Sequence, residues 1–370
     1  MGKLLAVLVL LGLGIWGAVE AGLIRIGNGD GEAQSASADA PAAPAQPTVA
    51  AYFPAEDSAI PTSAGPDPRP VMQAQVILER LGFSSGVIDG EEGASLAAAL
   101  RGFQVANSIQ ASGALDERTR EALARWDHIP STRTITISEE FARGPYVREI
   151  PDDPEDQARL SRLGYTNLME KLAERFHTTR ETLIALNSPQ TRVGPGARIV
   201  VPNTGNDRIA SDAAGDREWL RTLATLGVGT DQPRAASIIV DQSDGVLMAF
   251  DEDDRLIGQF PATMGSERDP LPVGEWRILG VSFNPEFHYN PELFWDVEDS
   301  ENDVTLPPGP NSPVGVVWID LSKEHYGIHG TPEPRNIGRT ESHGCIRLTN
   351  WDAARLALMV RSGVRATFRA

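Results

Sequence analysis

The chain has 370 residues, of which 41% are hydrophobic and 23% are charged, a composition typical of globular domains with flexible connections. This length is sufficient for two or three domains. The net charge of −18 argues against nucleic-acid binding, which needs clustered lysine and arginine side chains to face the phosphates.

The N-terminus has the pattern of an export signal. Lys3 precedes an unbroken apolar run over residues 4–19, which is short for a full membrane span. Small residues would allow cleavage after Ala21, and an uncleaved single N-terminal membrane anchor is the alternative. Residues 1–27 are therefore expected to be a signal or signal anchor that directs the chain to the periplasm or cell envelope.

Residues 28–68 are rich in Ala, Pro, Ser and Asp and show no helical or strand period. Such a segment cannot bury enough apolar surface to offset its chain entropy, so it is expected to be a disordered linker.

Residues 69–127 are expected to form a helical domain. Apolar or small residues recur at helical spacing in three stretches, which contain Val71, Ala74, Leu78 and Leu81, then Leu96, Leu100 and Phe103, then Thr119, Ala122 and Leu123. Asp89-Gly90 predicts a turn between the first two helices, and Asp116 is a good N-cap for the third. Three short helices with these features resemble a peptidoglycan-binding domain. A bundle that only packs against its neighbours is the alternative.

Residues 128–203 predict a second small module. Residues 134–137 alternate like a strand and are expected to pair with residues 146–147 in a hairpin. Two helices over 167–176 and 179–187 and a strand over 198–202 follow. The β-α-α-β order resembles a LysM-like glycan-binding module, and an inert spacer of the same shape is the alternative.

After a linker over residues 204–233 with one helix at 217–226, residues 234–370 contain many short strands separated by Gly and Pro turns. The strands are expected at 237–241, 246–251, 256–263, 274–279, 316–320 and 327–329. This pattern predicts a mainly-β sandwich or open barrel, followed by one helix at 351–361. The fold class is therefore multidomain α+β.

The candidate active site is a cysteine with two histidines nearby in sequence. Cys345 is the only cysteine, and His329 and His343 precede it. A thiol attacks carbonyls as its thiolate, so it needs a base, which either histidine could supply, while Gly344 would leave the cysteine amide open to a substrate oxygen. A buried inert cysteine is one alternative. A catalytic zinc site of these three side chains is another, but their spacing matches no common zinc motif.

Ser342-His343-Gly344-Cys345 with an upstream His329-Gly330 resembles the signature of the L,D-transpeptidases of the YkuD type. The resemblance extends over roughly 234–370 and includes segments 238–250, 270–274 and 307–315. It implies that Cys345 attacks the diaminopimelate–D-Ala bond of a tetrapeptide stem, forms a thioester and transfers it to an amine, which gives a 3→3 crosslink. It implies no cofactor and no metal, glycan strands and stem peptides of peptidoglycan as partners, and acylation by carbapenems.

The resemblance also implies roles for the neighbouring residues. His329 would be the base, oriented by the backbone carbonyl of Gly330. His343 would help to form the oxyanion site together with the amides of Gly344 and Cys345. A rearranged pair, with His343 as the base, stays open.

Two polar side chains complete the motif. Ser342 is expected to shape the loop by hydrogen bonding rather than to react. Arg347 could bind a stem-peptide carboxylate in bidentate fashion, or it could form only a surface ion pair. Tyr326, Trp318, Trp295 and Phe294 either line the cleft or belong to the core.

Several functions are compatible with this signature. Water, a D-amino acid or a protein amine could replace the second stem, which would give an L,D-carboxypeptidase, an exchange enzyme or a protein-to-wall ligase. A non-catalytic wall-binding protein is the alternative from a different class. We expect a monomer in a Gram-negative periplasm with a diaminopimelate-type wall.

Overall fold

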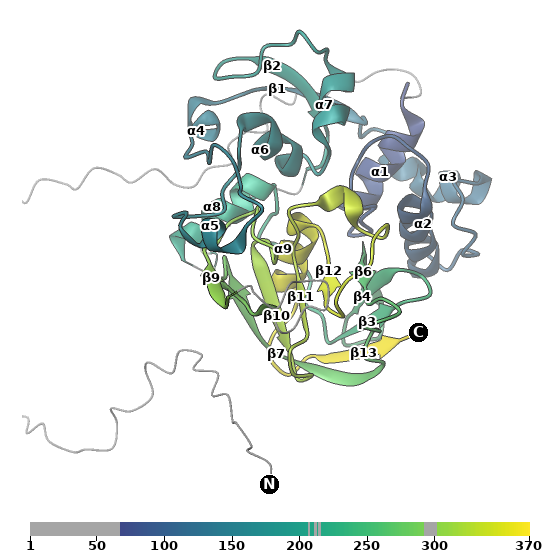
Figure 1. Cartoon of the computed structure of the whole chain (residues 1–370). Coiled ribbons are helices and arrows are strands. Elements are labelled where there is room, and N and C mark those ends of the chain that lie inside the picture. Colours follow the sequence, from purple (N-terminus) through teal and green to yellow (C-terminus); the bar gives the residue numbers. More distant parts are fainter. Residues whose placement is uncertain (1–66, 206–207, 211–212, 214–215, 292–301) are drawn as a thin grey trace, which may run out of the picture. The chain divides into compact units, whose positions relative to one another are not determined.

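The computed structural model describes residues 67–370 except 206–207, 211–212, 214–215 and 292–301 (Figure 1). The predicted signal and nearly all of the predicted linker over 28–68 lie outside the described residues, as do Phe294 and Trp295. Every helix within the described ranges is too short or too polar to cross a membrane.

The first described unit is helical, as predicted. It contains α1 (Pro70–Arg80), α2 (Ala94–Ala106), α3 (Glu117–Leu123) and the short 3₁₀ helix η2 (Ala124–Trp126). The side chain of Asp116 accepts a hydrogen bond from the backbone of Thr119, which is the predicted N-cap of α3. Leu78, Leu100 and Phe103 form the centre of its buried core. We call residues 69–127 the helical domain.

The second unit, which we call the βααβ module (residues 132–202), corrects one prediction. Its elements are β1 (Thr132–Thr136), α4 (Glu139–Ala142), α5 (Pro154–Ala158), α6 (Leu168–Arg175), α7 (Arg180–Leu186) and β2 (Arg198–Pro202). The predicted hairpin with residues 146–147 is wrong, because β1 pairs antiparallel with β2. Buried Ile135 of β1 and Ile199 of β2 pack in one apolar core with α6 and α7. The burial of these side chains therefore favours pairing of β1 with a strand that is distant in sequence.

The C-terminal unit is built on one nine-stranded sheet, in the order β5-β4-β3-β13-β7-β10-β11-β12-β6. The strands are β3 (Ser237–Asp241), β4 (Val246–Phe250), β5 (Leu256–Pro261), β6 (Thr263–Met264), β7 (Gly274–Phe283), β10 (Val317–Leu321), β11 (Gly327–His329), β12 (Ile346–Arg347) and β13 (Arg365–Arg369). The edge strands β5 and β6 are separated only by Ala262, so the sheet curls until its two ends meet. The open barrel is therefore the correct alternative, and the two-sheet sandwich is wrong.

Three smaller elements complete this unit. Strands β8 (Phe287–Tyr289) and β9 (Val304–Leu306) form a separate two-stranded sheet. Helix α8 (Arg217–Leu226) lies in the predicted linker, but its buried Trp219 and Leu223 belong to the same core as the strands. Helix α8 of the predicted linker therefore contributes to the core of the C-terminal unit.

Helix α9 (Asn350–Met359) follows the predicted catalytic motif and is buried along almost its whole length. Thr349 caps it by accepting a hydrogen bond from the Asp352 backbone. A helix with buried residues all round needs partners on every side. Here the partners come from all three units.

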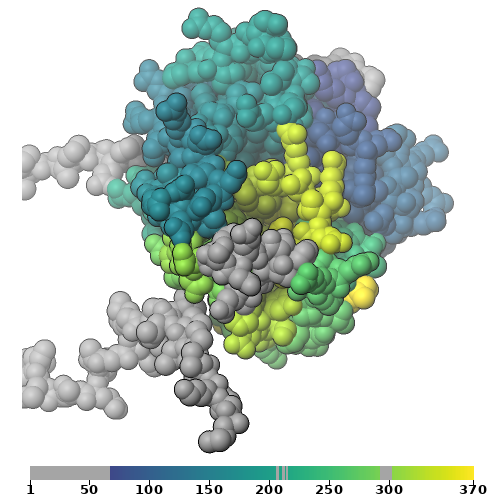
Figure 2. Space-filling model, in the orientation of Figure 1, coloured from purple at the N-terminus to yellow at the C-terminus, as the bar shows by residue number. Residues whose placement is uncertain are grey.

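The helical domain covers the edge of the barrel sheet. Phe83 forms a bridge with Gln259 of β5, and the amide of Ser84 donates to the Gln259 carbonyl at 2.9 Å. Covering an edge strand in this way removes a surface on which other chains could pair. Figure 2 shows the yellow-green C-terminal unit bordered by the teal βααβ module and the purple-to-blue helical domain.

Candidate active site

The barrel strands bring the predicted nucleophile and base close to each other. Strands β11 and β12 are parallel, with His329 opposite Arg347, and Cys345 immediately precedes β12. Since side chains of paired residues point to the same face, His329 and Arg347 share one side of the sheet. Cys345 lies close enough to this pair for the Arg347 charge to act on both His329 and Cys345.

His329 is held by its own strand end and by an aromatic neighbour. Its Nδ1 lies 2.7 Å from the carbonyl oxygen of Gly330, as the resemblance implied, and its ring stacks on Trp318 with centroids 5.5 Å apart. A carbonyl only accepts, so Nδ1 carries the proton and Nε2 carries the lone pair. Burial, together with the nearby charge of Arg347, lowers the pKa of His329 to about 4. The ring is therefore a neutral base at neutral pH.

Cys345 is half-buried, and its Sγ lies 3.8 Å from the carbonyl oxygen of His325. Burial raises the pKa of the thiol, while the Gly327 amide and the Arg347 charge oppose this increase. The resting pair is thus a neutral thiol and a neutral imidazole rather than an ion pair.

The loop that carries the cysteine is fixed by Ser342 and Gly344. The Ser342 hydroxyl donates to the Cys345 carbonyl and accepts from the Gly265 amide, both at 2.7 Å. Gly344 has φ = +97°, and a Cβ there would lie 2.6 Å from the ring of Tyr326. Any other residue at 344 would therefore be strained and would collide with that ring.

The remaining motif residues lie beside this loop. His343 and Arg347 are both half-buried, and Arg347 Nη1 donates to the Glu341 carbonyl at 3.5 Å. Within the described part of the chain, no three His, Cys, Asp or Glu side chains are grouped closely enough to hold a metal ion. The donor set for the zinc alternative is therefore not assembled there.

Two residues outside the sequence motif also support the site. Asn350 is fully buried against Gly330. Its partner Glu174 comes from α6 of the βααβ module. No local signal marks Glu174, because a glutamate in a short charged helix normally faces water. Trp318 was left open between cleft and core, and it packs on the base itself.

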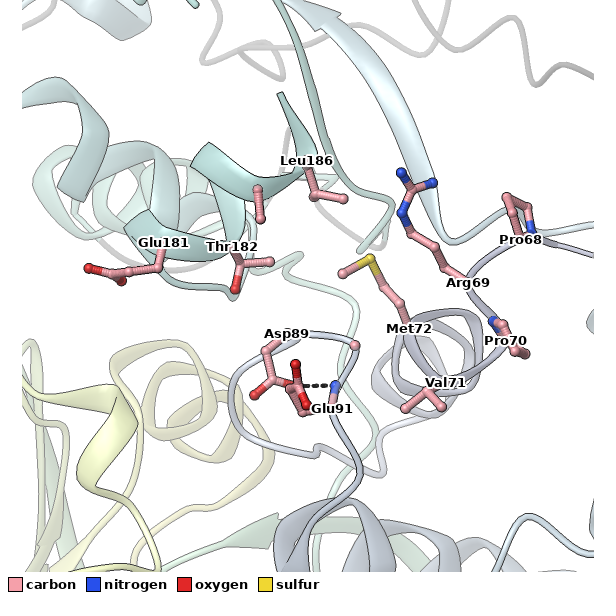
Figure 3. Close-up of a pocket in the computed structure, with 12 residues that line it drawn as sticks. Pro68, Arg69, Pro70, Val71, Met72, Asp89, Glu91, Glu181, Thr182 and Leu186 are labelled. Atoms are coloured by element: carbon pink, nitrogen blue, oxygen red, sulfur yellow. Dashed lines mark hydrogen bonds between the residues drawn. The ribbon is translucent and has the colours of Figure 1, made fainter. Parts of the chain in front are cut away.

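A separate pocket of about 570 Å³ lies between the helical domain and α7 (Figure 3). It is lined by apolar side chains such as Met72 and Leu186 and by carboxylates such as Asp89 and Glu181. None of its lining residues belongs to the barrel unit, so this pocket is distinct from the face that carries Cys345.

Two family comparisons match this chain. Residues 235–367 match the YkuD family, described as "L,D-transpeptidase catalytic domain". Residues 68–123 match a family described as "Putative peptidoglycan binding domain".

Similar proteins carry related names. The "Putative L,D-transpeptidase YkuD" of Bacillus licheniformis is 29% identical over 201 residues, which are 54% of this chain and 92% of that protein. Its namesake in Bacillus subtilis is 34% identical over 30% of this chain, and a "Putative L,D-transpeptidase" of Fuscovulum blasticum is 45% identical over 29% of it. In both cases the chain spans only 54% of the relative's own length.

Solved structures give more distant matches. An L,D-transpeptidase from Mycobacterium smegmatis is 20% identical, with a TM-score of 0.30, over 36% of this chain and 58% of that one. The catalytic domain of an Enterococcus faecium L,D-transpeptidase acylated by ertapenem is 18% identical, with a TM-score of 0.29, over 37% of this chain and 98% of that one. Residues 235–367 of this chain are therefore similar to the L,D-transpeptidase catalytic domain of the YkuD family, and residues 68–123 are similar to a peptidoglycan-binding domain.

Proposed function

We propose that the barrel unit is a peptidoglycan L,D-transpeptidase in which Cys345 is the nucleophile and His329 the general base. The observation that carries the proposal is the bond from His329 Nδ1 to Gly330 O, which leaves Nε2 free to accept a proton from the nearby cysteine. Because the pair is neutral at rest, the proton moves from thiol to imidazole as the sulfur attacks.

The proposed reaction has two acyl transfers. Cys345 attacks the carbonyl between diaminopimelate and D-Ala of a tetrapeptide stem, and His329 returns the proton to the departing amine. The side-chain amine of a second stem then attacks the thioester, which releases the thiol and forms the 3→3 crosslink. The amides of Gly344 and Cys345, with His343, would stabilise the oxyanion, and Arg347 would bind a stem carboxylate.

The other units would hold the enzyme on its polymeric substrate in the cell envelope. The peptidoglycan-binding domain supports this proposal, and we extend it to the βααβ module as a LysM-like glycan binder. Tethering to an insoluble polymer raises the effective concentration of stem peptides at the active site. We also propose a periplasmic location for the chain.

Incubation of the full chain with a purified disaccharide-tetrapeptide, followed by intact-protein and product mass spectrometry, tests the function. An acyl adduct on Cys345 and a dimer lacking one D-Ala are expected for the wild type, and neither is expected for Cys345→Ala. D-Ala loss without a dimer would indicate a carboxypeptidase. No adduct, with binding to sacculi retained, would leave a wall-binding protein.

A further inference from the structure

The side chain of Asn350 supports the backbone of the active site. This residue is fully buried, and its Oδ1 accepts from the Val316 amide at 3.3 Å. Its Nδ2 donates to the Pro310 carbonyl at 3.0 Å and to Glu174 Oε1 at 2.8 Å. Both amide hydrogens and the amide oxygen of this side chain thus have fixed partners.

Two glycines close around the same amide oxygen. A Cβ on either Gly315 or Gly330 would overlap Asn350 Oδ1, so both backbones approach it more closely than another residue would allow. Gly330 supplies the carbonyl that orients His329, at 2.7 Å from Nδ1. A displacement of Asn350 would therefore move the peptide that sets the direction of the imidazole.

Glu174 holds Asn350 from another unit of the chain. It is only 6% exposed, and its second carboxyl oxygen accepts from the Tyr165 hydroxyl at 2.8 Å. Burying a carboxyl group is costly, and an apolar side chain of similar size would serve packing alone at least as well. What the carboxyl group adds is a directed acceptor for the Asn350 amide.

We propose that Glu174 of the βααβ module is a positioning residue for His329, acting through Asn350 and the Gly330 peptide. This inference rests on the proposed role of His329 as the base for Cys345. It gives the module a part in the chemistry besides any role in binding the wall. The catalytic unit is incomplete without a side chain supplied by its neighbour.

The test uses the full chain and measures alkylation of Cys345 by iodoacetamide between pH 4 and pH 9 by intact-protein mass spectrometry. Glu174→Leu should slow alkylation between pH 5 and pH 8 by roughly tenfold or more, because an error of about 1 Å in a reacting group is this costly. Glu174→Gln keeps an acceptor for Asn350 Nδ2 and should stay within about threefold of the wild type.

Two matched controls separate positioning from general loss of packing. Tyr165→Phe removes the other hydrogen bond of Glu174 and leaves the Asn350 bond intact. Ser84→Ala removes a buried bond to Asp352 on the same helix α9. Both should lower the thermal midpoint of unfolding and leave the alkylation profile unchanged.

The results distinguish failure of the positioning role from failure of the proposed function. If His329→Ala slows alkylation and a folded Glu174→Leu does not, the positioning role is overturned and the proposed function stands. If His329→Ala has no effect, the proposed role of the base fails. Should Glu174→Leu not fold, Glu174→Met is the substitute, since its flexible side chain fills irregular space. A wild-type profile in Glu174→Met would then contradict the inference.

Discussion

At the scale of single residues, the site depends on how burial shifts the pKa values of His329 and Cys345. Burial lowers the pKa of His329 and raises that of Cys345, so both groups are neutral over most of the physiological range. The Arg347 charge lowers both values. Arg347 thus weakens the base and strengthens the acid.

Arg347→Gln should therefore change the pH dependence of Cys345 alkylation. The rate falls when His329 becomes protonated, near pH 4 in the wild type, and without the arginine this decline should begin at higher pH. The alkylation rate also rises at high pH as the thiol ionises, and without the arginine this rise should move to higher pH as well. Rates measured at several pH values test both shifts, with exposed Arg361→Gln as the control. A decline that moves to lower pH would contradict the assignment.

Gly344→Ala should disrupt the cysteine loop. A methyl group at φ = +97° costs about 1 kcal/mol or more, and here it also meets the Tyr326 ring at 2.6 Å. We expect alkylation of Cys345 to slow at least about tenfold. Gly363→Ala is the matched control, since it has φ = +91° with no atom within 4 Å of the added carbon. If both variants alkylate equally slowly, the close contact with Tyr326 is not the cause.

At the scale of elements, the buried helix α9 fixes the positions of its neighbours through hydrogen bonds from its first turn. Its first turn presents Asn350 to the active-site backbone and Asp352 to Ser84 of the helical domain. Burial, with Glu79 nearby, raises the pKa of Asp352, and burial raises the pKa of Glu174 to about 7. The contacts of this helix are therefore sensitive to pH near neutrality.

Glu174→Gln should remove part of the dependence of stability on pH. The folded pKa of Glu174 is raised from 4.5 to about 7, so its contribution is full below pH 4.5 and is lost as pH rises through 7. Tyr165 and Asn350 donate to this carboxylate and oppose the increase, while Glu170 adds to it. The loss amounts to up to about 3 kcal/mol.

Thermal midpoints of unfolding at pH 4.5 and pH 8.5 measure this effect. The thermal midpoint of the glutamine variant, relative to that of the wild type, should be higher at pH 8.5 than at pH 4.5. An equal difference between the two proteins at both pH values would show that Glu174 does not titrate as described.

At the scale of the whole described molecule, a buried charge cluster joins the three units. Glu79 of α1 bonds to Arg355 of α9 at 2.7 Å and to His177 at 2.8 Å, and the His177 ring stacks on Trp351. Burial raises the pKa of Glu79, but Arg355 and His177 together lower it below its ordinary value. The ionised carboxylate therefore links the helical domain, the βααβ module and the barrel unit.

Glu79→Ala should weaken the junction of all three units, because it leaves the Arg355 charge buried without its carboxylate. Removing one partner of a buried pair costs about 3–5 kcal/mol. The thermal midpoint should fall, and limited proteolysis should cleave between the units. Asp244→Asn is the control, since it breaks an exposed contact with Arg101 between the helical domain and the barrel unit and should cost less than about 1 kcal/mol. Equal effects would contradict a central role of the cluster.

Local chemistry explains what could be predicted from the sequence. Asp116 is the predicted N-cap of α3, and it accepts a backbone hydrogen bond from Thr119, the third residue after it. The positions of most strands followed from alternation and from Gly and Pro turns, but β8, β9, β12 and β13 were not predicted. These features depend on residues a few positions apart, so a linear pattern is sufficient to reveal them.

The sequence pattern thus predicted the α-helices except the short α4 and α5, most strands and the residues of the cysteine–histidine motif. Only the tertiary structure decided that β1 pairs with β2 and that Glu174 holds Asn350, 176 positions away. It also decided the protonation of the pair, because burial sets the pKa values of His329 and Cys345. Long-range pairing and desolvation arise from what the folded chain brings together, and no local pattern specifies either.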